Sequence, residues 1–306
     1  MSHRLRLVAA GSLVTVMAIA AAAAQPTSPR RDSTASPPTG KHLVWKVARA
    51  GRTTAFLVGS VHVLSKDVYP LPPLFDRVFE QTASLIEEVD LGETGDASAV
   101  MATAMQAVFT DGQTLESVLD AKVYARVTEK AEAAGLPMLV VDRMKPWLVA
   151  VTLSVPDLQR AGFDPAYGLD RHFYDRAKKA ARPVRGLETA AYQIDRMNGL
   201  SLPVQVEMLK AMLDDVDTQV GGVKDIVAGW RAGDVAALER LLLKEFRESP
   251  EVYQRLIVER NKNWVPAITE CRAEAPCLVV VGGAHLLGGD GLVALLAREG
   301  FTVEQQ

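Results

Sequence analysis

The stretch FLVGSVH at Phe56–His62 decides the fold of this chain, because it returns in outline as LVVVGGAH at Leu278–His285. Each copy begins with an apolar run that is typical of a buried strand. Glycine, two small or apolar residues and histidine follow, and glycine permits a sharp turn where a strand ends. Each histidine is therefore expected just beyond the carboxyl end of a strand, where open α/β sheets bind their ligands.

The segments around these two stretches predict an α/β fold, with a mixed central β-sheet flanked by helices and a helix-rich middle section. Two apolar runs, Leu43–Ala48 and Thr54–Val58, are separated by a segment that contains Gly51, and we expect them to form a hairpin. Helices are expected wherever apolar residues recur at helical spacing. The expected elements are strands at Leu43–Ala48, Thr54–Val58, Leu85–Leu91, Leu278–Val281 and Phe301–Val303; helices from Pro72–Pro73, within Ala97–Gly233, after the N-cap Asp234, over Glu251–Cys271 and over Gly291–Glu299; and possible short strands at Met138–Val141 and Pro183–Gly186.

The first residues predict export. Arg4 and Arg6 precede an apolar run, and small residues end near Ala24, so residues 1–24 are interpreted as a secretory signal peptide. The alternative is an uncleaved N-terminal anchor. Residues 25–40 are rich in Pro, Ser and Thr and predict a disordered leader, which leaves 41–306 as one domain. No later run is apolar enough to predict a membrane span after cleavage, and the expected location is periplasmic or secreted.

Charge and cysteine content narrow the class of partner. The net charge is −3, with acidic and basic residues interspersed, which argues against nucleic acid as a partner. Only Cys271 and Cys277 are present, too few for a disulfide scaffold or a four-cysteine zinc site. In an oxidising compartment they are expected to form a disulfide between a helix end and the next strand. Two buried free thiols are the alternative.

His62 and His285 are the leading candidates for a site. Neutral imidazole is a common ligand of divalent metal cations, and carboxylates complete such sites. The matched position of the two histidines favours a shared function, whereas two loop histidines bonded to backbone carbonyls are the alternative reading. Nothing in the sequence identifies the metal.

Carboxylates come from three places. Strand alternation over Leu85–Leu91 places Glu88 and Asp90 on one face and Glu87 on the other, and a charge inside a sheet is costly unless it is paired or bound to metal. An edge strand with solvated carboxylates is the alternative. Asp170 and Glu188 each follow a turning point, where the sequence alone favours a helix cap or first-turn acid over a site residue.

Arg260 and Asn261 lie within the long helix that precedes the second Gly-x-x-His. An arginine there could clamp a substrate oxygen or hold a carboxylate of the site in place, or it could simply face water. Arg143, before a Lys-Pro-Trp sequence, is ambiguous in the same way.

Taken in order, these segments resemble the TraB/GumN family, which is related to the Tiki proteases and to a wider group that contains erythromycin esterases. The carrying segments are Val58–Leu64 with Tyr69–Pro72, Glu88–Leu91, Gly168–Asp170, Gly186–Thr189, Glu259–Asn261 and Val281–Leu286 with Gly288 and Gly291. They cover nearly the whole chain after the leader. Glu87 directly before Glu88 departs from the usual pattern and leaves the choice between these two acids open.

The resemblance implies an α/β fold and, as in Tiki-like members, metal-dependent hydrolysis of peptide bonds. It implies that His62, His285 and Glu88 hold a divalent metal cation, with Glu88 and Arg260 in catalytic roles. The substrate would be a peptide or another small molecule. The alternatives are a non-enzymatic protein that binds a metal, haem or a peptide, and an accessory factor in polysaccharide export. The sequence says nothing of the oligomeric state.

Overall fold

The computed structural model describes residues 40–92, 105–213 and 216–306 of the chain. The predicted signal peptide at 1–24 and nearly all of the predicted leader at 25–40 lie outside this described part, and so does the start of the predicted helical middle. Within these three ranges, no helix is both long enough and apolar enough to cross a membrane.

A mixed sheet of six strands forms the centre of the described fold, as predicted. Its order is β4-β3-β5-β2-β1-β6. The four strands from β4 to β2 run parallel, and β1 is antiparallel to both of its neighbours. The strands are β1 (Val44–Arg49), β2 (Arg52–Ser60), β3 (Ser84–Glu87), β4 (Val184–Gly186), β5 (Cys277–Gly282) and β6 (Thr302–Gln305).

The parallel pairing decides where the site lies. Ser60 pairs with Gly282 across β2 and β5, and Glu87 pairs with Val280 across β3 and β5. The three strands therefore end close together at one edge of the sheet, and the residues that follow them meet there. All six residues of β5 are buried, as expected of a strand covered on both faces.

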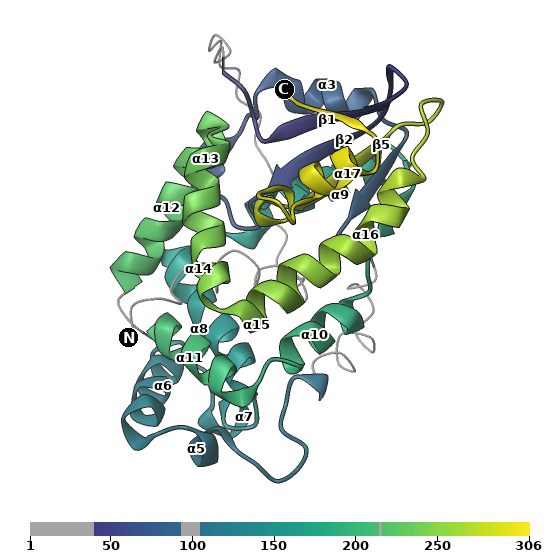
Figure 1. Ribbon diagram of the computed structural model, residues 1–306. Helices are drawn as coiled ribbons and strands as arrows, with labels where there is room; N and C mark the ends of the chain where they lie inside the picture. The colour runs from purple at the N-terminus through teal and green to yellow at the C-terminus, as the bar shows by residue number, and fades with distance from the viewer. Residues whose placement is uncertain (1–39, 93–104, 214–215) are drawn as a thin grey trace.

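Helices cover the sheet and extend the molecule to one side. Figure 1 shows the strands at one end of the molecule and α5, α6 and α7 at the other. The helices before β5 in sequence are η1 (Lys66–Val68), α3 (Pro73–Glu80), α5 (Leu115–Val118), α6 (Ala121–Ala133), α7 (Met138–Val141), α8 (Pro146–Arg160), η3 (Pro165–Tyr167), α9 (Leu169–Lys179), α10 (Ala190–Asn198), α11 (Leu202–Leu213), α12 (Val216–Ala232), α13 (Val235–Leu238), η4 (Glu239–Leu243), α14 (Lys244–Glu248), α15 (Pro250–Tyr253), η5 (Gln254–Val258) and α16 (Glu259–Thr269); η6 (Gly283–Leu286) and α17 (Leu292–Arg298) follow it.

An aromatic cluster joins three of these helices. The ring of Phe75 in α3 stacks on Trp230 in α12 with centroids 5.7 Å apart, and it lies 6.4 Å from the ring of Phe173 in α9. α9 also packs on β3 and β5. Large aromatic surfaces contribute much of the burial in a core, so this cluster fixes α9 and α12 beside the ends of the strands.

Several predicted elements are confirmed. The predicted hairpin forms, with Ala50 and Gly51 both at positive φ (49° and 76°), as a two-residue turn between twisted strands requires. Asp234 caps α13 by accepting a hydrogen bond from the backbone N–H of Ala237, as predicted. Of the two possible short strands, Val184–Gly186 is one.

Three predictions need correction. Met138–Val141 is the helix α7, where Leu139 is 85% exposed, because this short apolar run starts a turn after Pro137 instead of entering the sheet. The strand predicted over Leu85–Leu91 ends at Glu87, and β3 lies between β4 and β5, so it is not an edge strand. The helix predicted over Glu251–Cys271 contains a π-helical segment, η5.

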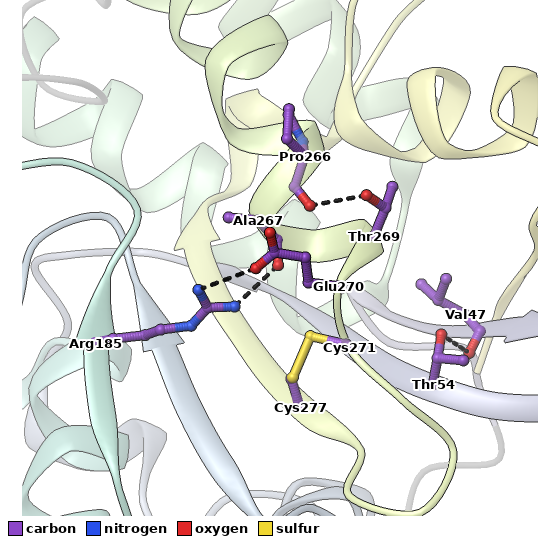
Figure 2. The surroundings of a disulfide bond; sticks show 9 residues. All are labelled: Val47, Thr54, Arg185, Pro266, Ala267, Thr269, Glu270, Cys271 and Cys277. Carbon is purple, nitrogen blue, oxygen red and sulfur yellow. Dashed lines mark hydrogen bonds and ion pairs between the residues drawn. A yellow bond between two sulfur atoms is a disulfide. The ribbon is translucent and has the colours of Figure 1, made fainter.

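The cysteine pair lies where it was predicted, between a helix end and the next strand. The sulfur atoms of Cys271 and Cys277 are 2.13 Å apart. Figure 2 shows the pair beside Arg185 of β4, which donates a hydrogen bond to the backbone carbonyl of Ala267 in α16. The disulfide and the hydrogen bond from Arg185 both attach the end of α16 to the sheet. Several residues of the candidate site lie on α16.

Candidate functional site

The two predicted histidines and Glu88 surround one glycine at the edge of the sheet. A Cβ atom added to Gly282 would lie 3.1 Å from His62 Nε2, 3.2 Å from Glu88 Oε1 and 3.7 Å from His285 Cδ2. All three side chains are buried, with exposed fractions of 6%, 4% and 3%. The structure thus brings together, from three strand ends, residues that lie far apart in the sequence, the two histidines being 223 positions apart.

The first glycines of the two Gly-x-x-His turns have different roles. At Gly282 an added methyl group would enter the space between the three candidate side chains. At Gly59 it would instead collide with the side chain of Leu43, which also lies against Gly283. Gly59 therefore permits tight packing under the turn, whereas Gly282 keeps the site open.

Glu88 lies between the two histidines and is held as an anion. Its Oε1 is 3.8 Å from His62 Nε2 and 4.0 Å from His285 Nε2, and it accepts a 2.7 Å hydrogen bond from the backbone N–H of Gly282. Its Oε2 accepts a 2.6 Å hydrogen bond from Arg260. Burial would raise the pKa of Glu88, but Arg260, the histidines and the Gly282 amide outweigh it and lower that pKa below its usual value.

Arg260 links Glu88 to a second buried carboxylate, Glu188. The guanidinium Nη2 lies 2.7 Å from Glu188 Oε1, and Nε donates to the same carboxylate. Trp264 Nε1 donates to Glu188 as well, at 2.9 Å. The remaining guanidinium nitrogen, Nη1, donates to the backbone carbonyl of Leu256 in the π-helical segment η5. Such segments often occur at functional sites, and here the segment provides an acceptor that holds Arg260.

His285 is neutral, and its tautomer follows from its neighbours. Asn261 donates through Nδ2 to the backbone carbonyls of His285 and Asp290, so its Oδ1 faces His285 Nδ1 at 2.7 Å and accepts the proton there. Arg260 Nη1 lies 3.1 Å from the other ring nitrogen, Nε2, which must therefore be the acceptor. Burial and the charge of Arg260 lower the pKa of His285 to about 3.

His62 has the opposite surroundings. Its Nδ1 lies 3.3 Å from Asp170 Oδ1, and Ser60 Oγ donates to that same oxygen at 2.9 Å, which fixes the carboxylate. Burial would lower the pKa of His62, but the charges of Asp170 and Glu88 outweigh it and raise the pKa. The pKa values of the two histidines are therefore shifted in opposite directions, upward for His62 and downward for His285.

The sequence Gly168-Leu169-Asp170 explains how α9 reaches His62. A Cβ on Gly168 would collide with the backbone carbonyl of His62, so only glycine allows this approach. The backbone N–H of Leu169 donates to the carbonyl of Val61 at 3.3 Å. These contacts place Asp170, in the first turn of α9, beside the imidazole ring. Asp170 is therefore both a first-turn acid and part of the site.

Two histidines and a carboxylate are donor types found in divalent metal sites. Among the described residues, however, no group of three or more histidine, cysteine, aspartate or glutamate side chains is placed to hold a metal ion. A zinc ion with bonds of roughly 2.0–2.1 Å holds its donor atoms about 3.3 Å apart. The separations of 3.8 and 4.0 Å from Glu88 to the histidine Nε2 atoms are slightly longer. A carboxylate beside the ring nitrogen that does not bind the metal, as Asp170 lies beside Nδ1 of His62, is a usual partner of metal-binding histidines.

Glu87 is buried beside this site without joining it. Its side chain is 2% exposed, and neither carboxylate oxygen has a hydrogen-bond partner among the described residues. It lines a small cavity with His62, Glu88 and Asp170. Burial and the nearby carboxylates raise the pKa of Glu87 well above its usual value. Of the two neighbouring acids, Glu88 is the one that contacts the histidines and Arg260.

Two other sequence candidates lie elsewhere. Arg143 is exposed and follows α7, at the end of the molecule far from the strands in Figure 1. Asp90 lies beyond the end of β3, where its carboxylate accepts from the backbone N–H of Gly92 in a turn. Strand alternation therefore does not place Asp90 beside Glu88, because the strand ends at Glu87.

Sequence reasoning missed four contributors. Trp264 lies one helical turn after Arg260 in α16, a spacing that could have indicated it. Ser60 and Gly282 lie within the quoted Gly-x-x-His stretches, but only the structure reveals their contacts. Gln193 in α10 donates to both Glu88 and Glu188, at 3.3 and 3.1 Å, and no sequence signal points to it.

Comparison with known proteins agrees with this arrangement of segments. The chain is 26% identical over 266 residues to a protein named YbaP, called uncharacterized, from Escherichia coli (strain K12) and from Shigella flexneri; the match covers 84% of this chain and 94% of YbaP. No solved structure matches. The model of the TraB/PrgY/gumN family matches residues 43–305, which include every residue of the site. The chain belongs to the TraB/PrgY/gumN family.

Proposed function

We propose that this protein is a metal-dependent hydrolase that cleaves peptide bonds outside the cytoplasm. The observation that carries the proposal is the convergence of His62, Glu88 and His285 around Gly282, with the guanidinium of Arg260 against Glu88. Two histidines and one carboxylate leave positions open for water and substrate, as catalytic metal sites do.

A divalent cation held by these three side chains would supply Lewis-acid chemistry at the sheet edge. The chain itself orients the donors. Asn261 keeps the proton of His285 on Nδ1, and the carboxylate of Asp170 lies beside Nδ1 of His62. Both Nε2 atoms then face Glu88. Because all of these groups are nine-tenths buried or nearly so, little reorganisation is needed before reaction.

The geometry favours a ligand role for Glu88 over a role as general base. Its carboxylate accepts from Arg260, Gly282 and Gln193, and its pKa is lowered. A strongly stabilised carboxylate is a weak base, since proton transfer works best when the pKa lies near the working pH. Arg260, held by two carboxylates, is a fixed positive charge that could stabilise negative charge developing on a substrate oxygen.

A second candidate, a binding protein without turnover, is favoured by one specific contact. Arg260 Nη1 lies 3.1 Å from His285 Nε2, the nitrogen that a metal would need. In this arrangement Arg260 is itself the cation of the cluster, neutralising Glu88 and Glu188. No contact of the described residues supports a role in polysaccharide export.

Metal analysis and peptide cleavage together test the two candidates. The purified chain is analysed for bound metal, then stripped with a chelator and titrated with Zn²⁺, Mn²⁺ and Co²⁺. We expect His62→Ala and His285→Ala each to weaken binding by at least about 100-fold, since each removes one of three ligands. His172→Ala is the control, because that histidine packs on Tyr69 outside the cluster. Metal binding without cleavage of any peptide in a mixture would favour the binding protein, and absence of metal binding would overturn the metal site.

The location outside the cytoplasm is part of the proposal. It is supported by the predicted signal peptide at residues 1–24 and by the disulfide between Cys271 and Cys277, since disulfides persist in oxidising compartments. Mass spectrometry of the protein recovered from cells should give an N-terminus near Gln25. A full-length, membrane-bound species would contradict export by cleavage.

A further inference from the structure

We propose that the apolar cavity beside His62 binds a branched aliphatic side chain of the substrate, of about the size of leucine, next to the bond that is cut. The cavity has a volume of about 30 Å³, which is room for roughly two or three waters. It opens partly to the surface and adjoins the candidate site. For the bond that is cut, this inference rests on the proposed hydrolase; for recognition of the side chain, it is tested without turnover.

Both Gly-x-x-His turns form the floor of this cavity. Ser60 and His62 come from the first turn, and Gly283 and Ala284 from the second. A substrate group in the cavity would therefore touch the same two turns that carry the candidate ligands. His62 also lines the acidic cavity of Glu87 and Asp170, so its side chain borders both an apolar and an acidic cavity.

The opposite walls are aliphatic and aromatic. The contributing residues lie on α12, α13 and η4, and they are Val223, Ile226, Trp230, Leu238 and Leu242. The polar side-chain atoms of the lining belong to Ser60, His62 and Trp230. Ser60 Oγ donates to Asp170, and Trp230 Nε1 donates to the backbone carbonyl of Gly59. A polar substrate group would lose its hydrogen bonds to water here without replacement, so the cavity selects against such groups.

The wall at Trp230 is fixed before any substrate arrives. Its Nε1 donates a 2.8 Å hydrogen bond to the backbone carbonyl of Gly59, and its ring stacks on Phe75 with centroids 5.7 Å apart. The ring therefore cannot turn inward to fill the space. A preformed cavity of this kind, next to convergent polar groups, is the usual form of a small-molecule subsite.

The test uses two blocked amino acids, N-acetyl-leucine amide and N-acetyl-glycine amide, titrated into the ¹⁵N-labelled purified chain and followed by NMR. We expect the leucine compound to bind at least about tenfold more tightly, because a few methylene groups in an apolar pocket give discrimination on this order. The shifted amides should include those of residues 59–62 and 223–230. Equal affinity for both compounds would overturn the proposal.

Filling the cavity should abolish this preference. Val223→Phe places a ring in the space, whereas Ala228→Phe adds the same ring at an exposed position of the same helix, away from the lining. The proposal requires loss of leucine selectivity in the first variant and its retention in the second. Unchanged selectivity in Val223→Phe would overturn it.

Enlarging the cavity provides the second test, should Val223→Phe fail to fold. Ile226→Ala should shift the preference from the leucine to the phenylalanine amide, and no shift would contradict the proposal. A series of peptides differing only at the residue beside the cleaved bond then tests the proposed hydrolase separately. Selective binding without cleavage would contradict the proposed hydrolase and support the side-chain site. Cleavage without selectivity would support the hydrolase and contradict the side-chain site.

Discussion

His62 and His285 each follow a buried parallel strand through a glycine turn, yet their surroundings favour opposite charge states. Asp170 and Glu88 raise the pKa of His62, while burial and Arg260 lower the pKa of His285 to about 3. The partner of the far nitrogen differs correspondingly: a carboxylate for the first histidine and a carboxamide for the second. The shared backbone plan positions both rings, but residues from other helices decide their chemistry.

The helices responsible come from different parts of the chain. α9 brings Asp170 to the first turn, and α16 brings Arg260 and Asn261 to the second. In the proposed metal site, such a pair would place less negative charge around a divalent cation than two histidines with carboxylate partners would. Because each histidine has its own neighbouring helix, substitutions on α9 and on α16 can test the two turns separately.

The largest effect is expected at Arg260, the residue that distinguishes the second turn. Arg260→Met removes the cation from between Glu88 and Glu188, whose side chains are each 4% exposed. Breaking a buried ion pair by removing one partner typically costs about 3–5 kcal/mol of unfolding free energy. Urea unfolding of the variant should show this loss at neutral pH and less of it in acid, where the carboxylates protonate. The surface substitution Arg171→Met, whose ion pair with Asp175 is exposed, should change stability by less than about 1 kcal/mol.

The two glycines provide a matched pair of substitutions with different expected outcomes. Gly59→Ala should cost about 1–3 kcal/mol of stability, because its methyl group meets the buried side chain of Leu43. Gly282→Ala should chiefly weaken metal binding, because its methyl group enters the space between His62, Glu88 and His285. Thermal unfolding and metal titration of both variants measure this difference. Equal effects of the two substitutions on metal affinity would show that the turns do not differ in this way.

A smaller effect is expected from exchanging the residues that lie beside Nδ1 of each histidine, Asp170 and Asn261. Asp170→Asn and Asn261→Asp should each change metal affinity by about 10–100-fold, the usual range for groups that orient a metal-binding histidine. Asp170→Asn should also lower the pKa of His62, and Asn261→Asp should raise that of His285. Both can be followed by NMR titration of the imidazole protons in the metal-free protein. An unchanged His62 titration in Asp170→Asn would mean that the 3.3 Å contact has no electrostatic effect.

The sequence predicts the sheet and its edge well because these depend on local pattern. Apolar runs, glycine turns and capping residues determine β2, β5 and α13, and each is formed largely by its own segment. The position of Asp170 next to His62 depends instead on α9 crossing the sheet, and it cannot be inferred from its own turn. For the same reason, the sequence alone favours helix-start acids over site residues for Asp170 and Glu188, whereas the structure places both carboxylates in the site.

Length errors in the predicted elements had consequences for the site. Taking the strand to run to Leu91 placed Asp90 beside Glu88, whereas the strand ends at Glu87 and the chain turns. The apolar run Met138–Val141 fits a strand or a helix equally well, and its position away from the sheet decides for the helix. Gln193 reaches Glu88 only because α10 lies against the site, a tertiary contact that has no local signature.

The last expected effect is a difference in the pH dependence of stability between the two histidines, measured in the presence of a metal chelator. His285 has a folded pKa of about 3, below the unfolded value of 6.5, so the unfolded chain binds the extra proton and stability falls as pH drops from 6.5 toward 3. A raised pKa at His62 has the opposite sign, because that contribution is present below pH 6.5 and is lost as pH rises through the folded pKa. One proton corresponds to about 1.4 kcal/mol per pH unit. His285→Gln should therefore lessen the decline between pH 6 and 4, and His62→Gln should lessen the decline above pH 6.5. Urea midpoints at several pH values measure both slopes, and parallel curves for the two variants would show that the two turns do not impose opposite charge states.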